Sequence, residues 1–219
     1  IVDLTHPFDA QTVYWPTEEG FVLEGAPGAV TDGGYYYEAH RFRAAEHGGT
    51  HIDAPVHFSA TGQHVDEIPL EHLIARRVVV DVESACLEDR DHQVDVADLQ
   101  AWEKEHGEIP RGAIVLLYTG TSRFWPDRTR YLGTSERGAA AVASLHFPGL
   151  SADAARWLIE ERAVVAVGID TASIDHGPSK RFETHQTLFA ANVPAFVNLA
   201  ALDLLPAPDF AVVAVPMKV

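Results

Sequence analysis

Three short runs of apolar residues recur along the chain, at residues 77–82, 113–118 and 164–169. They are nearly continuous rather than alternating, which is typical of strands covered on both faces. Two other segments, 95–105 and 151–162, carry apolar residues at helical spacing, and each begins with a residue that can cap a helix, Asp95 or Ser151. Strands and helices that alternate in this way predict an α/β fold with a mixed sheet.

The remaining segments complete the prediction of the fold. A third helix is expected over residues 183–191, where Asn192 and Pro194 end it. Further strands are expected over residues 1–4, 35–42 and 210–215, and a loop over residues 5–20. The chain contains no internal repeat, linker or low-complexity run, so we expect a single domain over residues 1–219.

The chain is strongly acidic, with 16 Lys and Arg against 32 Asp and Glu, which gives a net charge of −16. Such a charge repels phosphate groups, so neither nucleic acid nor an anionic membrane is an expected partner. No run of about 18 apolar residues occurs, so no membrane-spanning segment is expected. The one cysteine, Cys86, can form neither an internal disulfide nor a zinc–thiolate cluster. We therefore expect a cytoplasmic location, and the start at Ile1 in place of Met suggests a trimmed N-terminus.

Three histidines and an aspartate lie within eleven residues, at His47, His51, Asp53 and His57. Imidazole nitrogens and carboxylate oxygens are preferred ligands of zinc, manganese and iron. The spacing differs from the helical His-Glu-x-x-His pattern of zinc proteases, and the two glycines after the first histidine disfavour a helix. A loop that doubles back can instead aim His47, His51 and Asp53 at one point, with Thr50 and Ile52 facing the opposite side.

Two histidines and one carboxylate leave coordination positions open for water, whose pKa a metal lowers to about 7. His57 lies beyond this ligand set and could act as a general base or acid. The same ligand types form the facial triad of non-haem iron oxygenases, although the two histidines of that triad are usually far apart in sequence. Unconnected surface histidines are the remaining alternative, which the density of the cluster disfavours.

The histidine-rich segment, HGGTHIDAPVHF over residues 47–58, resembles the signature of the metal-dependent cyclase-like hydrolases, a family that includes bacterial kynurenine formamidases and isatin hydrolases. Three further stretches are similar to that family: DLTH over residues 3–6, GIDTASIDHG over 168–177, and HQTLFAANVP over 185–194 followed by NLAALDLLP over 198–206. The segment 168–177 and the ending VPMKV resemble the isatin hydrolase branch more than the formamidase branch.

The resemblance implies a role for each matching residue. His47, His51 and Asp53 match the metal ligands of the family, and His57 matches its catalytic histidine. His185 matches a histidine that holds a second metal in dinuclear formamidases. The glutamate that completes that second site is replaced by Val197 in this chain. The resemblance therefore implies one divalent ion, Mn²⁺ first and Zn²⁺ second, with His185 free to bind substrate or move a proton.

The resemblance also implies a fold, an assembly and a reaction. The family fold is a swivelling β/α sandwich with a small barrel-like sheet, and its members are usually dimers or tetramers, so a homodimer or homotetramer is expected. The expected reaction is hydrolysis of a cyclic amide in a small aromatic substrate, with isatin opened to isatinate. The alternatives are a kynurenine formamidase, a hydrolase of another lactam or lactone, or a degenerate member that only binds a metal or a small ligand.

A flat aromatic substrate requires an apolar slot, and several aromatic residues lie in loops that could form one. The candidates are Tyr14, Trp15, Phe58, Phe124 and Trp125, of which Trp15, Phe58 and Trp125 are taken as the substrate-binding residues. Ser173 and His176 follow the strand predicted at residues 164–169, and sites in α/β proteins gather at the carboxyl ends of strands. Ser173 is therefore the fourth predicted substrate contact, and the alternative for Ser173 and His176 is a turn held by their own side chains. The alternative for each aromatic residue is packing in the core.

Overall fold

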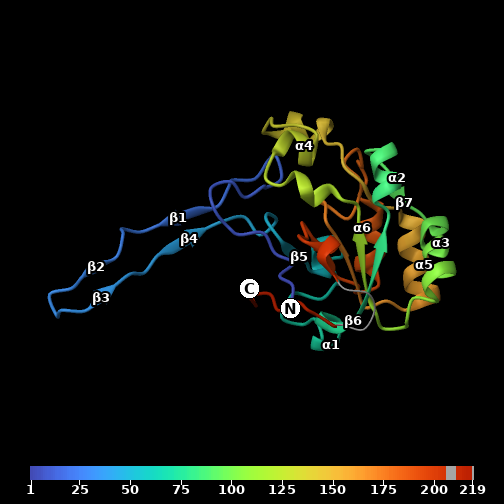
Figure 1. Ribbon diagram of the computed structural model, residues 1–219, viewed down its shortest axis with the longest axis horizontal. Helices are drawn as coiled ribbons and strands as arrows, with labels where there is room; N and C mark the ends of the chain where they lie inside the picture. Colours follow the sequence, from blue (N-terminus) through green and yellow to red (C-terminus); the bar gives the residue numbers. More distant parts are fainter. Residues whose placement is uncertain (206–210, 219) are drawn as a thin grey trace.

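The computed structural model describes residues 1–205 and 211–218. At its centre is a curled six-stranded sheet in the order β12-β6-β8-β10-β11-β5 (Figure 1). The strands of this sheet are β5 (His51–Asp53), β6 (Ile74–Asp81), β8 (Ile114–Tyr118), β10 (Ala166–Ile169), β11 (Ala195–Val197) and β12 (Ala211–Val213). The inner strands β6, β8, β10 and β11 are parallel, whereas β12 and β5 are antiparallel to their neighbours. The predicted α/β class with a mixed sheet is confirmed.

The three predicted apolar strands form the middle of this sheet, and both faces are covered. Val115 and Leu117 of β8 pack in one hydrophobic cluster with residues of the helices α3 (Val96–His106) and α5 (Ala152–Arg162), including Leu158. Ile114 and Leu116 point the other way, into a second cluster formed with residues near both ends of the chain. Because each face has its own core, the strand carries apolar residues at every position.

The three predicted helices are present as α3 (Val96–His106), α5 (Ala152–Arg162) and α6 (Glu183–Ala190). Asp95 begins α3 with a capping box, because its side chain accepts from the backbone N–H of Asp98 and the Asp98 side chain accepts in return. Ser151 caps α5 in the predicted way. The shorter helices are α1 (Leu70–Leu73), α2 (Glu83–Glu88), α4 (Arg128–Leu132), and the 3-10 helices η1 (Pro55–His57), η2 (Thr121–Phe124), η3 (Ala139–Ser144) and η4 (Leu202–Leu204). Among the described residues, no helix is long and apolar enough to cross a membrane.

Two of the predicted strands differ from the structure, and a third is only partly described. The strand expected over residues 1–4 is wrong: Leu4 packs against the second hydrophobic cluster, and its carbonyl accepts from Ala200, but the segment does not join a sheet. The strand expected over residues 35–42 is divided between two short strands, β3 (Tyr36–Tyr37) and β4 (Arg41–Arg43). The strand expected over residues 210–215 is present as β12, and Phe210 lies outside the described residues.

A long hairpin projects from the body of the molecule (Figure 1). Its two sides pair as β1 (Val22–Glu24) with β4, and as β2 (Ala29–Val30) with β3. We call residues 22–43 the arm. The chain enters the arm shortly after Tyr14, which forms an isolated antiparallel bridge with Gly48, and leaves the arm shortly before His47. Both ends of the arm are therefore attached close to the histidine-rich segment. A separate small sheet pairs β7 (Gln93–Val94) with β9 (Gly149–Leu150).

Candidate metal centre

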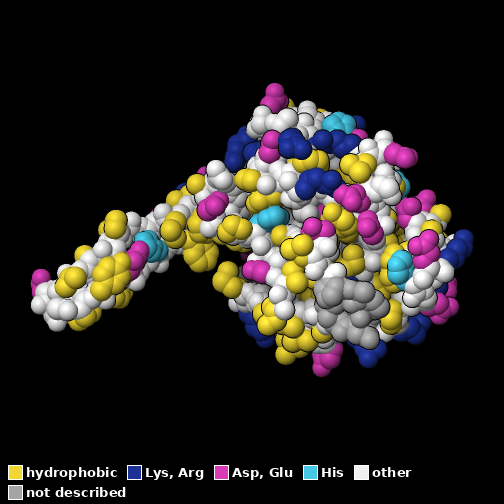
Figure 2. Space-filling model, viewed as in Figure 1, with side chains coloured by type: hydrophobic (Ala, Val, Ile, Leu, Met, Phe, Trp, Pro, Cys, Tyr) yellow, Lys and Arg dark blue, Asp and Glu magenta, His cyan; other side chains and the backbone are white. Residues whose placement is uncertain are grey.

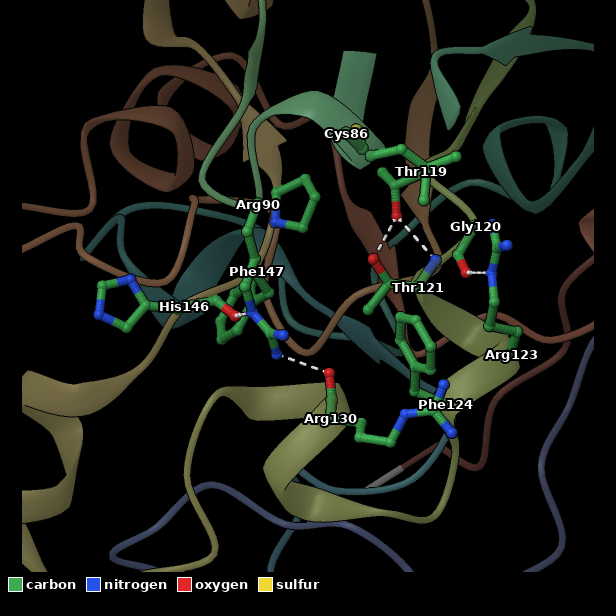
Figure 3. Close-up of a pocket in the computed structure, with 12 residues that line it drawn as sticks. Cys86, Arg90, Thr119, Gly120, Thr121, Arg123, Phe124, Arg130, His146 and Phe147 are labelled. Atoms are coloured by element: carbon green, nitrogen blue, oxygen red, sulfur yellow. Dashed lines mark hydrogen bonds between the residues drawn. The ribbon is translucent and has the colours of Figure 1, made fainter. Parts of the chain in front are cut away.

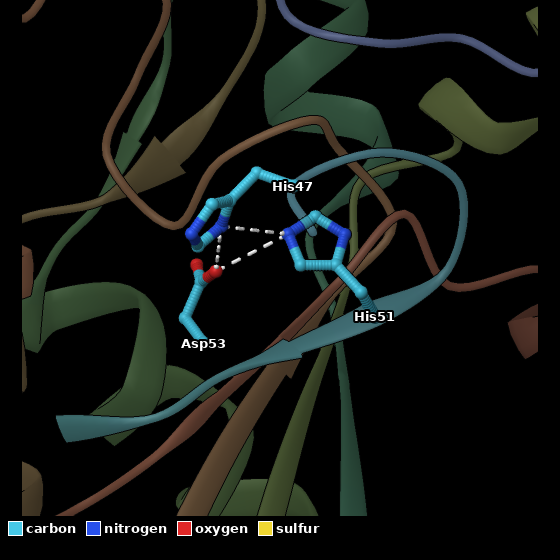
Figure 4. A group of neighbouring side chains, drawn as sticks. All are labelled: His47, His51 and Asp53. Atoms are coloured by element: carbon cyan, nitrogen blue, oxygen red, sulfur yellow. Dashed lines mark hydrogen bonds and ion pairs between the residues drawn. The ribbon is translucent and has the colours of Figure 1, made fainter. Parts of the chain in front are cut away.

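The structure brings His47, His51 and Asp53 together, with their side chains pointing toward one another (Figure 4). Asp53 Oδ1 lies 2.8 Å from His47 Nδ1 and 3.2 Å from His51 Nε2, and the two nitrogens are 3.3 Å apart. Among the described residues, these three form the one group of His, Cys, Asp or Glu side chains whose geometry could hold a metal ion.

The two glycines between His47 and His51 are explained by the path of the loop. A Cβ atom on Gly48 would lie 2.0 Å from Cδ1 of Tyr14, whose ring is buried against the glycine. Gly49 has a φ of 60°, a left-handed conformation that glycine adopts without strain. The segment can therefore double back tightly enough to return His47 to the residues of β5.

Strand β5 supplies the other two members of the group by simple alternation. His51 and Asp53 are two residues apart and face the same side, whereas Ile52 packs on the opposite side in the cluster that contains Phe196. β5 is held at the sheet edge by antiparallel pairing with β11, in which His51 lies opposite Val197. The expected orientation of Ile52 is confirmed.

The tautomer of His51 is set by its neighbours. Its Nδ1 donates to the carbonyl oxygen of Gly49 at 2.9 Å, so a neutral ring presents an unprotonated Nε2 to the cluster. The same carbonyl accepts from Nδ2 of Asn198 at 2.7 Å, although Asn198 is 149 residues away in sequence. Asn198 also accepts from the Thr50 hydroxyl through its backbone oxygen. These bonds fix the loop on both sides of the histidine.

The donor set fits a divalent cation. Ligands at about 2.1 Å from one tetrahedral ion stand roughly 3.4 Å apart, close to the separations observed here. Burial alone would raise the pKa of Asp53, but His51 and hydrogen bonds from His185 and His47 hold it well below its usual range. Asp53 is thus an ionised, almost fully buried carboxylate beside two imidazoles, an arrangement that a bound cation would neutralise. That these residues are ligands stays a prediction.

Two more histidines lie beside this group. The ring of His57, at the end of η1, stacks on His47 with a centroid distance of 3.9 Å, and burial lowers the pKa of His57 to about 4. His185, on α6, is buried, and its Nε2 lies 3.4 Å from Asp53 Oδ2. Burial opposes charge on His185, but hydrogen bonds to Asp175 and Asp53 raise its pKa to about 9. The structure therefore places both predicted catalytic histidines at the candidate metal group.

Asp175 is a site residue that sequence reasoning missed. Its Oδ2 accepts from His185 Nδ1 at 2.6 Å and from the His185 backbone N–H at 3.1 Å, so it fixes both the ring and the start of α6. Burial favours a higher pKa for Asp175, but its bonds to His185 lower the pKa overall. The available signal was its position in the segment 168–177, ten residues before His185.

The group of His47, His51 and Asp53 lies in the wall of a cavity of about 220 Å³. Three of the predicted substrate-binding residues, Trp15, Phe58 and Ser173, line this cavity. Its remaining lining residues are Val13, Tyr14, Glu18, His47, Gly48, His51, Asp53, His57, Ala172, Phe182, His185 and Asn198. Of these, Val13, Glu18, Ala172, Phe182 and Asn198 were not anticipated.

Trp125, the fourth predicted substrate contact, is not brought to this cavity. Its ring stacks on His6 at a centroid distance of 4.0 Å and meets Tyr131 edge to face. Trp125 thus packs against a hydrophobic cluster that includes Val13, rather than on the cavity wall. Proximity to a proline-containing loop could not distinguish this packing position from a position on the cavity wall.

Val197 occupies the position at which the resemblance implies a second-metal glutamate. Its side chain is fully buried in the main hydrophobic cluster, together with Leu188 and Phe189 of α6. An isopropyl group offers no ligand atom, so Val197 itself cannot hold a second ion, and the binding of a single ion stays a prediction.

A second, smaller cavity of about 40 Å³ lies near Cys86 and α4 (Figure 3). Its arginines already have protein partners: Arg90 donates to the carbonyl oxygens of His146 and Arg130, and Arg123 pairs with Glu83. Burial raises the pKa of the Cys86 thiol to about 12, with a contribution from nearby aspartates. These groups stabilise the local structure, and we assign them no chemistry.

The fold and the site define an α/β protein with a partly buried two-histidine, one-carboxylate group in an aromatic cavity. Residues 2–176 match the model of the Cyclase family, described as "Putative cyclase". The chain belongs to this family, and the predicted resemblance is confirmed.

Relatives and solved structures agree with this membership. The chain is 32% identical over 183 residues to an isatin hydrolase of Roseibium aggregatum, which covers 80% of this chain and 66% of that protein. It is 29% identical over 179 residues to a kynurenine formamidase of Paracidovorax citrulli, covering 78% of this chain and 69% of the relative. The structure of isatin hydrolase A from Ralstonia solanacearum superposes with a TM-score of 0.85 at 32% identity, over 100% of this chain and 86% of the other. The relatives named here are hydrolases, which supports an enzymatic role.

Proposed function

We propose that this chain hydrolyses the cyclic amide of a small aromatic substrate, with isatin as the first candidate and isatinate as the product. The observation that carries the proposal is the position of His47, His51 and Asp53 in the wall of a cavity that also contains two further histidines and several aromatic side chains. The similarity to isatin hydrolases in sequence and structure supports the same reaction.

One divalent ion, Mn²⁺ first and Zn²⁺ second, would be held by His47, His51 and Asp53. When bound, such an ion polarises a carbonyl group and makes water more acidic. The residues themselves prepare this site: Gly49 and Asn198 hold His51 with Nε2 toward the ion, and the Asp53 carboxylate is kept ionised by the surrounding imidazoles. An ionised carboxylate and a neutral imidazole are the forms that bind metals.

His57 and His185 lie on the cavity side of the ligand group and would handle protons. In the reaction, a water oxygen forms a bond to the amide carbon, the bond from that carbon to the ring nitrogen breaks, and a water proton moves to the nitrogen. His57 would carry this proton, because it lines the cavity and stacks on His47. His185, whose Nδ1 is fixed by Asp175, lines the same cavity and would bind substrate or move a proton.

The aromatic residues would bind the flat ring of the substrate. Phe58 lies between Phe182 and His185, with centroid distances of 5.3 Å and 4.7 Å, and Trp15 lines the same cavity. Such rings prefer offset stacking or edge contacts with an aromatic ligand. Ser173 offers a hydroxyl group in this largely apolar wall.

The test is the loss of the visible absorbance of isatin on addition of the manganese-loaded protein, with an EDTA-treated sample and a His57→Ala variant as controls. Rapid loss that disappears with EDTA and returns with added metal supports the proposal. Turnover that requires oxygen would point to an oxygenase instead, so the assay is repeated without oxygen.

A second candidate is hydrolysis of N-formylkynurenine, which the similarity to kynurenine formamidases favours. The chemistry is the same, with the formyl carbon as the point of attack and formate as the leaving product. Parallel assays with both substrates separate the candidates by their ratio of kcat/KM. Absence of turnover with either substrate, with the metal still bound, would leave a hydrolase of another lactam or lactone, or a protein that only binds its ligand.

A further inference from the structure

The cavity beside the candidate metal centre has a wall with few charged side chains. Among the described residues, its lining contains no Lys or Arg and two carboxylates, those of Asp53 and Glu18. Asp53 is almost fully buried, and its oxygens lie within 3.4 Å of nitrogen atoms of His47, His51 and His185. Of the two carboxylates, Glu18 is therefore the one that lies outside the metal group.

The side chain of Glu18 is half-buried and has no ion pair within the part of the chain that the structure describes. Its carboxylate accepts from the hydroxyl of the neighbouring Thr17 at 3.2 Å. Its backbone is already engaged, because the N–H donates to the carbonyl of Trp15 at 3.0 Å and the carbonyl accepts from Arg137 at 3.1 Å. The carboxylate is thus the part of Glu18 that remains to meet a ligand.

The segment that carries Glu18, residues 14–18, is held on two sides. Its alternate carbonyl oxygens accept hydrogen bonds from the region 128–138: Tyr14 from Arg128 at 3.0 Å, Pro16 from Gly138 at 2.8 Å and Glu18 from Arg137 at 3.1 Å. Just before the segment, the carbonyl of Val13 accepts from the N–H of Gly49, in the loop of the metal group, at 3.0 Å. These bonds keep the segment in place as part of the cavity wall.

The arginines that bind this segment do not lie in the cavity wall. Arg128 and Arg137 donate to backbone carbonyls, and neither of them lines the cavity. Figure 2 shows several Lys and Arg side chains gathered over the region of α4, at the top of the body. Charges of one sign act more strongly in a cleft with low-dielectric walls than on an open surface. A ligand in the cavity therefore meets the carboxylate of Glu18 without a Lys or Arg beside it.

The proposed reaction creates a negative charge in this cavity. The oxygen of water bonds to the amide carbon, the bond from that carbon to nitrogen breaks, and one water proton goes to the nitrogen. The carboxylic acid that forms then loses its remaining proton to solvent, so a neutral amide becomes an anion. Because like charges repel, the carboxylate of Glu18 would weaken binding of the product relative to the substrate.

We propose that Glu18 is a specificity-determining residue, whose carboxylate makes the cavity bind neutral aromatic molecules in preference to aromatic anions of the same shape. The part that concerns the product rests on the proposed function: Glu18 would speed release of the carboxylate formed by ring opening. The preference itself requires only that a flat aromatic ligand enters the cavity, which Trp15, Phe58 and Phe182 also line.

The test compares two probes of the same shape, nitrobenzene and benzoate, which differ by one negative charge and are not hydrolysed. Equilibrium dialysis of the manganese-loaded protein gives both dissociation constants, and the readout is the ratio of the benzoate value to the nitrobenzene value. We expect Glu18→Gln to lower this ratio by about three- to tenfold, because a repulsive charge is removed. Glu18→Lys, which reverses the charge, should lower the ratio by about the same factor again.

Two control variants separate the charge of Glu18 from other effects. Glu18→Asp changes the side chain but keeps the charge, so the ratio should stay near that of the wild type. Glu19→Gln makes the same exchange one residue further on, where the carboxylate pairs with Arg43 and does not line the cavity. It should leave the ratio unchanged. Cooperative unfolding and an equal metal content show that each variant is folded and loaded.

A ratio that is the same in the wild type, Glu18→Gln and Glu18→Lys would overturn the proposal. An equal fall of the ratio in Glu19→Gln would also do so, because the effect would then come from the general charge of the protein. Failure of both probes to bind the wild type would overturn it as well. The readout is an equilibrium and not turnover: a protein that leaves isatin intact but shows the expected ratios refutes the proposed function alone, and one that opens isatin with unchanged ratios refutes the role of Glu18 alone.

Discussion

Asn198 and His51 hydrogen-bond to the same atom, the carbonyl oxygen of Gly49, at 2.7 Å and 2.9 Å. Asn198 lies directly after β11 and has a φ of 54°, a left-handed conformation that asparagine tolerates better than most residues. Its side chain also accepts from the Tyr131 hydroxyl at 2.8 Å. The C-terminal part of the chain therefore holds the turn that sets the tautomer of His51, and Asn198 is a positioning residue for the metal group.

We predict that Asn198→Asp lowers metal affinity by roughly 10- to 100-fold, because the carboxylate cannot donate to Gly49 while the bond from Tyr131 is preserved. Competition with a chelator measures this affinity. The matched control is Tyr131→Phe, which removes the other side-chain hydrogen bond of Asn198 and should lower stability with little change in affinity. A folded Asn198→Asp variant that binds metal as the wild type does would show that the shared carbonyl is unimportant.

Asp53→Ala should abolish metal retention. The variant removes the charged member of the group and leaves two neutral imidazoles, which hold a divalent ion weakly. Metal analysis after dialysis gives the stoichiometry, with the exposed Asp203→Ala as control. Full occupancy in Asp53→Ala would mean that the site is assigned to the wrong residues.

Asp175→Asn should reduce kcat by about 10- to 100-fold and leave the metal content unchanged, because Asp175 orients His185 without touching the ligand group. Steady-state kinetics and metal analysis on the same preparation separate the two effects. Ser179→Ala is a matched control: Ser179 bonds the other oxygen of Asp175, Oδ1, at 3.2 Å. If both variants lose the same amount of activity, the hydrogen bond between Asp175 and His185 contributes no more to kcat than the bond between Asp175 and Ser179.

Glu103→Gln should lower the free energy of unfolding by about 1–2 kcal/mol at neutral pH. Glu103 accepts from Arg162 Nε and Nη2 at 2.6 Å and 2.8 Å, and this hydrogen bonding lowers the pKa of Glu103 below its ordinary value of 4.5. Because the folded pKa is the lower one, the stabilisation is complete above pH 4.5 and is lost as the pH falls through the folded value.

Urea unfolding at several pH values measures this difference, which should shrink toward zero in acid. The control is Asp153→Asn, which breaks the exposed pair with Arg156 and should change stability by less than about 0.5 kcal/mol. A constant difference between wild type and Glu103→Gln down to low pH would contradict the assignment.

Cys86 should react slowly with thiol reagents in the folded protein. Burial raises the pKa of its thiol to about 12, so the reactive thiolate is scarce at neutral and mildly alkaline pH. Labelling with a disulfide reagent should be complete in denaturant and slow without it. Equal rates in both conditions would indicate that the region around α2 opens readily.

The central strands could be predicted because a strand buried on both faces carries apolar residues at consecutive positions. β8 has a core on each side, so its apolar residues are continuous. β5 has no such apolar run, because His51 and Asp53 face a polar site. The strand also depends on pairing with β11, which is more than 140 residues away in the sequence. The strand predicted at residues 1–4 is wrong because an apolar residue there does not require a strand. Leu4 is apolar because it packs against a hydrophobic cluster on one face of the sheet, although the segment itself does not join the sheet.

The site could be predicted as far as residues are close in sequence. His47, His51 and Asp53 lie within one short segment, so their chemistry and spacing were visible together. Asp175 and Asn198 act on these residues through hydrogen bonds that only the fold creates. Sequence could not separate Trp15, in the cavity wall, from Trp125, which packs behind it, because both are aromatic residues next to a proline.

Two of the three candidate ligands lie on β5, and β5 is the edge of the sheet. An edge strand of three residues has few hydrogen bonds and is among the first elements to open in local unfolding. Loss of β5 from β11 would separate His51 and Asp53 from the histidines on other elements while β8 and β10 stay folded. The temperature at which activity ends should therefore lie below the temperature at which the protein unfolds, and saturating metal should bring the two together.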